Sequence, residues 1–182
     1  MRHIISCFVE NHPGVLARVA GLFSARGFNI DSLNVGTTID PTVSRMTIVS
    51  TGDDQVISQI IKQLEKLIDV IEVRDLTQDE HVERELLLIK IECNKENRRE
   101  VIELADIFRA KIVDCGPESM VIEVVGAGGK VNGFFNLLQN YRILQITRTG
   151  RVALPRAAAT SAPQSTAYGV TKDQHSESED QV

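Results

Sequence analysis

The chain has 182 residues, of which 42% are hydrophobic, and a formal net charge of -5. This length suits one ordinary domain or two small ones, and the acidic balance argues against a nucleic-acid-binding protein. The opening segment MRHIISCFVE holds too short an apolar run for a signal peptide or a membrane span, so we expect a cytoplasmic protein.

The first half of the chain gives strand and helix signals in the order strand, helix, strand, strand, helix, strand. These segments are 3–9, 15–26, 28–35, 43–51, 53–67 and 70–76. Gly27 is a helix stop, and the hydrophobic alternation of 28–35 slips by one residue, which predicts a β-bulge near Asp31. The strand at 28–35 is expected to lie at the edge of its sheet.

The second half repeats this order, although it shares almost no aligned identities with the first. Its segments are 84–93, 97–110, 111–117, 119–126, 128–141 and 143–150. Each half fits the ferredoxin-like βαββαβ plan, a four-stranded antiparallel sheet with two helices on one face, so the fold class is α+β. We expect domains at 1–77 and 84–156, a polar linker at 78–83, and a disordered tail at 157–182, where small and polar residues dominate.

No motif predicts catalysis or a metal site. The four histidines are scattered and no cysteine stands near them at a zinc-like spacing. The segment GAGGK at 126–130 lacks the Ser or Thr that follows the lysine of a phosphate-binding loop, which favours a simple strand-to-helix turn. Cys7, Cys93 and Cys115 lie in separate apolar stretches, which indicates buried, reduced thiols.

The turn NHPG at 11–14 precedes the first helix and has the composition of an anion site. A helix N-terminus presents unpaired backbone N–H groups that suit a carboxylate. Asn11 and Pro13 are expected to shape the turn, with Pro13 at the first helical position, and Gly14 lets a ligand approach the backbone. In the alternative interpretation, Asn11 only caps the helix and Gly14 only serves the turn.

A second asparagine, Asn29, follows the same helix and opens the predicted edge strand. Its amide oxygen can accept a hydrogen bond from an ammonium group, while Ile30 or Leu33 offers an apolar wall. A dimer joined along this edge would place the Gly14 turn of one subunit against Asn29 of the other and leave a slot for a small apolar amino acid. Alternatively, Asn29 is simply a residue that tolerates the turn after a helix.

Three segments, ENHPGVLARVAGLFSARGFNIDSLNV, DPTVSRMTIV and HVERELLLIKI, resemble successive hallmarks of the acetolactate synthase (acetohydroxyacid synthase) regulatory small subunits. The resemblance implies an N-terminal ACT domain, a second ferredoxin-like domain and no catalytic site. It also implies a homodimer that activates a separate catalytic (large) subunit, which carries thiamine diphosphate, Mg²⁺ and FAD, and feedback inhibition by valine in branched-chain amino acid biosynthesis. A free-standing ACT-domain sensor of amino acids is the alternative.

Carried over from this resemblance, the valine contacts fall on the turn, on the start of the first helix and on the residues after that helix. They are Asn11, His12, Gly14, Val15, Leu16, Asn29 and Ile30. The resemblance assigns the main contacts to Asn11, Gly14 and Asn29, and backbone contacts to His12, Val15, Leu16 and Ile30.

Overall fold

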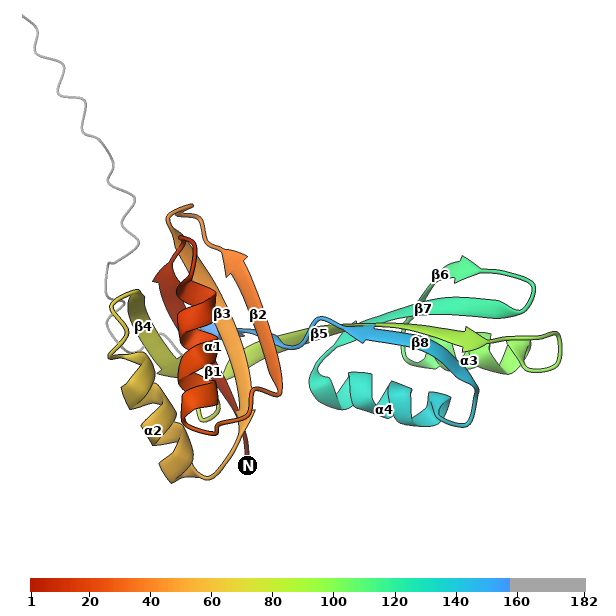
Figure 1. Cartoon of the computed structure of the whole chain (residues 1–182). Helices are drawn as coiled ribbons and strands as arrows, with labels where there is room; N and C mark the ends of the chain where they lie inside the picture. Colours follow the sequence, from red (N-terminus) through yellow and green to blue (C-terminus); the bar gives the residue numbers. More distant parts are fainter. Residues whose placement is uncertain (158–182) are drawn as a thin grey trace, which may run out of the picture.

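The computed structural model describes residues 1–157, which form two domains, each an antiparallel sheet with two helices on one face (Figure 1). The two ferredoxin-like units predicted from the sequence are confirmed. The predicted disorder of 157–182 falls, apart from Ala157, outside the described residues. No helix within residues 1–157 is long and apolar enough to cross a membrane.

The first domain contains four strands in the order β2-β3-β1-β4, all antiparallel. Its elements are β1 (Arg2–Glu10), α1 (Val15–Ala25), β2 (Ser32–Thr37), β3 (Val43–Thr51), α2 (Asp54–Leu64) and β4 (Val70–Asp75). The apolar stripes of α1 and α2 pack on alternate residues of β1 and β3, around Phe23, Ile48 and Ile60. The sheet order makes β2 an edge strand, as the sequence predicted.

The second domain repeats this plan with the strand order β6-β7-β5-β8. Its elements are β5 (His81–Glu92), α3 (Arg98–Ile107), β6 (Lys111–Cys115), β7 (Ser119–Gly126), α4 (Gly128–Leu138) and β8 (Ile143–Arg148). Residues Leu87, Ile89 and Ile91 of β5 pack with Phe134 of α4 in a separate core. The two domains therefore have independent hydrophobic cores.

The domains are joined by β5, which Figure 1 shows running from one to the other. It begins at His81, so part of the predicted linker is strand. Its first residues pair with β9 (Val152–Pro155), a strand that the sequence analysis did not predict. Ala153 of β9 is buried with Ile4, Val49 and Leu76 of the first domain. This small apolar contact fixes the end of the second domain against the sheet of the first.

Two sequence predictions are wrong in detail. The β2–β3 register is continuous from Ser32 to Thr37, and the strand begins after Asp31, so the slip in the apolar pattern marks the strand start and not a bulge. Cys7 and Cys93 are buried, but Cys115 is exposed because β6 is the edge strand of the second sheet.

Candidate functional site

The turn before α1 has its geometry fixed by a glycine. Gly14 is the residue that precedes the helix, its φ is +92°, and no side chain caps the helix there. A positive φ strains most residues other than glycine, so glycine is the residue that suits this turn best. Because no side chain caps α1, the N–H groups of its first turn remain available to a ligand.

Asn11 positions this turn without capping the helix. Its backbone N–H donates to the Thr42 carbonyl at 2.7 Å, and its side-chain amide donates to the Pro41 carbonyl at 2.8 Å. The interpretation of Asn11 as a helix cap is therefore wrong. Pro13 lies before Gly14 and outside the helix, so its predicted place at the first helical position is also wrong. Asn11 instead ties the start of α1 to the β2–β3 connection.

That connection is itself ordered by Asp40. Its carboxylate accepts hydrogen bonds from the Thr42 hydroxyl at 2.6 Å and the Thr42 backbone N–H at 2.8 Å. These two bonds, the side-chain one first, lower the pKa of Asp40 because they favour its charged form. The loop that receives Asn11 is thus a defined turn.

A charged cluster lies beside the turn. His12 Nε2 is 3.1 Å from Asp69 Oδ1 and 3.2 Å from Glu10 Oε2, while Arg18 Nε lies 2.6 Å from Asp69 Oδ2. Asp69 is only 4% exposed, so its charge needs these partners. The carboxylates of Glu10 and Asp69 and the imidazole of His12 lie close enough together to bind a metal ion. However, Arg18 already contacts both carboxylate oxygens of Asp69. Arg18 and Asp69 form an ion pair, and the contacts of His12 with Asp69 and Glu10 hold its side chain beside the start of α1.

Arg18 and Asp69 were not among the site residues predicted from the sequence. One signal was present, since Asp69 is a carboxylate between apolar residues in LIDV, and a buried carboxylate requires a cationic partner. The partner could not be identified from spacing, because the two residues stand 51 positions apart.

The remaining predicted residues lie at the other end of α1. Gly27, with a φ of +68°, ends the helix there. The Asn29 amide N–H donates to Asp31 Oδ1 at 2.8 Å, and the Asn29 carbonyl accepts from the Ser50 hydroxyl at 2.7 Å. Since the side-chain bond uses only the amide nitrogen, the amide oxygen of Asn29 is available as an acceptor.

A single chain does not assemble all seven predicted residues. Helix α1 has 11 residues and is therefore about 16 Å long, which separates the Gly14 turn from Asn29 and Ile30. At the first end, Val15 is buried in the core and offers only backbone, whereas Leu16 is 47% exposed and offers its side chain. Ile30 is half-buried against the same core. The predicted residues thus form two separate groups, one at each end of the helix.

Two ferredoxin-like units, the first with an uncapped helix start tied to the β2–β3 connection, are the arrangement of the ACT-domain class. A family model described as "AHAS small subunit-like ACT domain" matches residues 5–72, and a model described as "Small subunit of acetolactate synthase" matches residues 84–157. The chain belongs to the acetolactate synthase small-subunit family.

Individual relatives match both domains together. A "Probable acetolactate synthase small subunit" of Archaeoglobus fulgidus is 54% identical over 86% of this chain and 98% of its own length. The "Acetolactate synthase isozyme 3 small subunit" of Escherichia coli is 46% identical over 86% of this chain and 96% of its own. The crystal structure of the small subunit from Thermotoga maritima superposes with a TM-score of 0.78 at 44% identity, over 86% of this chain and 98% of that one.

Proposed function

We propose that this chain is the regulatory subunit of an acetolactate synthase, which activates a separate catalytic subunit and confers inhibition by valine. The observation that supports this is family membership across both domains, since the relatives that match from end to end are named small subunits. The partner would be the catalytic (large) subunit, which would hold thiamine diphosphate, Mg²⁺ and FAD. The holoenzyme would serve branched-chain amino acid biosynthesis in the cytoplasm.

The Gly14 turn is the proposed site for the valine carboxylate. The N–H groups of the first turn of α1 and the positive end of its dipole favour a negative charge there. The left-handed backbone of Gly14 carries no side chain that would cover these donors. The exposed side chain of Leu16 gives the valine methyl groups an apolar neighbour.

The ammonium group of valine is proposed to meet Asn29 of a second subunit. Strand β2 is an edge strand with one unpaired side, and a second copy related by a twofold axis would extend the sheet across it. Such a homodimer would bring the Gly14 turn of one subunit to Asn29 and Ile30 of the other. Valine would then bind between subunits, and its binding would depend on the dimer.

The alternative is a stand-alone ACT-domain sensor that regulates gene expression or another enzyme. The acidic net charge weighs against direct binding to DNA. A second domain that matches the acetolactate synthase small subunits favours the partner-bound role.

A mixing experiment tests these functions. The purified chain is titrated into the catalytic subunit, and acetolactate formation is followed with and without valine, with an equal mass of an unrelated protein as the control. We expect no turnover by the chain alone, a saturable rise in the partner's rate, and loss of that rise with valine. Turnover by the isolated chain would contradict a non-catalytic role, and an unchanged rate of the partner would favour the sensor.

A further inference from the structure

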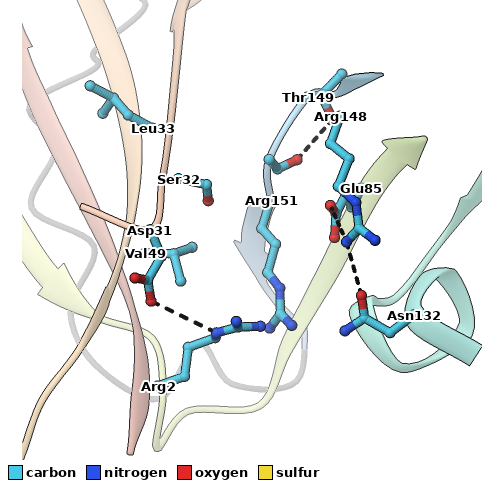
Figure 2. Close-up of a pocket in the computed structure, with 11 residues that line it drawn as sticks. Arg2, Asp31, Ser32, Leu33, Val49, Glu85, Asn132, Arg148, Thr149 and Arg151 are labelled. Carbon is cyan, nitrogen blue, oxygen red and sulfur yellow. Dashed lines mark hydrogen bonds and ion pairs between the residues drawn. The ribbon is translucent and has the colours of Figure 1, made fainter. Parts of the chain in front are cut away.

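A polar cavity lies between the two domains, away from the Gly14 turn. Its volume is about 360 Å³. Arg2, Asp31 and Ser32 line it from the first domain, while Glu85, Asn132 and the 148–151 segment line it from the second (Figure 2). Figure 2 shows the side chains of Arg2 and Arg151 reaching into the space between the domains from opposite sides. The cavity exists only where the two domains meet.

Three guanidinium groups line this cavity, and each lies beside one carboxylate. Arg2 has one ion pair, with Asp31 Oδ2 at 4.0 Å, beyond hydrogen-bond length. Arg148 donates from Nη1 to Asn132 at 2.9 Å and to Glu85 at 3.4 Å, and its guanidinium lies over the Phe135 ring. Arg151 donates from Nη1 to Glu83 at 2.8 Å. A guanidinium has five N–H donors, so most donors of the three arginines are not engaged by these contacts.

The two carboxylates of the cavity are already occupied. Glu85 is 7% exposed and lies 3.4 Å from Arg148. Asp31 accepts hydrogen bonds from Asn29 at 2.8 Å and from Thr51 at 2.6 Å. Each arginine of the cavity therefore faces one carboxylate: Arg2 faces Asp31, Arg148 faces Glu85 and Arg151 faces Glu83. What these contacts leave unengaged are further guanidinium N–H donors.

The β8–β9 turn brings the second domain to this position. Gly150 has a φ of +76°, and a side chain there would lie 2.8 Å from the Cβ atom of Ser32. The absence of a side chain allows the turn to approach the start of β2 closely, and this sets Arg151 opposite Arg2 across the cavity. Guanidinium groups bind phosphate and carboxylate through paired N–H bonds.

We propose that this interdomain cavity binds a small multivalent anion that carries phosphate or carboxylate groups, with Arg2 and Arg151 as its main ligands. The volume lies within the range of small-molecule sites. This inference goes beyond the proposed function, because none of the seven residues proposed to bind valine lines the cavity. An anion bound to both arginines would hold the two domains in the arrangement of this structure.

Isothermal titration calorimetry of the full chain tests the site. Inorganic phosphate is the first probe and citrate the second, and sodium chloride at matched ionic strength measures non-specific screening. Arg2→Gln removes one guanidinium whose single ion pair is long. Arg99→Gln is the matched control, because it removes the same charge from a side chain that is 92% exposed on α3 and outside the cavity. Arg151→Lys keeps the charge that faces Glu83 and removes the paired N–H geometry.

We expect saturable binding of phosphate or citrate to the wild type and to Arg99→Gln, and at least about tenfold weaker binding to Arg2→Gln, or roughly 1.4 kcal/mol. Arg151→Lys should weaken binding as well while its circular dichroism spectrum stays unchanged. If phosphate binds and citrate does not, the ligand class is phosphate esters, and the reverse result assigns carboxylates. Heat that matches sodium chloride for both probes, or equal affinities of the wild type and folded Arg2→Gln, would overturn the proposal.

Discussion

Substitution of Gly14 gives the sharpest test of the valine site, if two variants of nearly equal shape are compared. Both Gly14→Asn and Gly14→Asp place a side chain on a backbone with a φ of +92°. A side chain in this conformation is strained by about 1–2 kcal/mol, although Asn and Asp tolerate it better than other residues. Apart from its chain neighbours, a Cβ atom at Gly14 would have no atom within 4 Å, so strain is the main penalty and steric clash is absent.

Only the aspartate adds a charge, and the difference between the two variants isolates its effect on the ligand. A carboxylate roughly 4 Å from the valine carboxylate would repel it by about 4 kcal/mol at an effective dielectric of 20. Arg18 would not neutralise the new charge, because it already pairs with Asp69. If solvent leaves a third of that repulsion, the affinity of Gly14→Asp for valine falls about tenfold below that of Gly14→Asn.

Equilibrium dialysis of labelled valine against both variants measures this difference, and urea unfolding measures the strain that they share. We expect similar free energies of unfolding for the two variants, both below the wild-type value. The complex of Gly14→Asp with the catalytic subunit should stay active and resist valine. Equal affinities of folded Gly14→Asn and Gly14→Asp would refute the placement of the valine carboxylate at this turn.

Four further results are expected. Asn29→Ala should weaken valine inhibition and spare activation, since a hydrogen bond to a charged group contributes about 1.5–3 kcal/mol; unchanged valine sensitivity in a folded dimer would remove Asn29 from the site. Deletion of residues 160–182 should leave activation and valine response nearly intact in the mixing assay, because both cores are complete before them. A thiol reagent should label the exposed Cys115 rapidly, and Cys7 and Cys93 only after unfolding, because both are buried. Burial also raises the pKa of the Cys7 thiol to about 12 and so keeps it protonated. Gly150→Ala should lower the melting temperature more than Gly27→Ala, because both have a positive φ but only the former brings a side chain against β2.

The sequence was sufficient to predict the fold of each domain, because the apolar periodicity of most strands and helices can be recognised within a single segment. Alternating apolar residues in β1 and β3 and the helical stripe from Val15 to Phe23 can each be recognised within one segment. Segment boundaries were less reliable. Strand β9 has only four residues and is stabilised by pairing with the start of β5, so its own composition gave no signal.

The sequence by itself determined two ferredoxin-like units, the edge position of β2 and the use of Gly14 at a helix start, since these follow from periodicity and from the conformational range of glycine. Only the tertiary structure decided which side chains meet. It paired Asp69 with Arg18, directed Asn11 to a carbonyl of the β2–β3 turn, and set Arg2 opposite Arg151 between the domains. The reason is physical: hydrogen bonds and ion pairs act over a few ångströms between residues far apart in the chain, and their geometry exists only after the sheets and helices have packed.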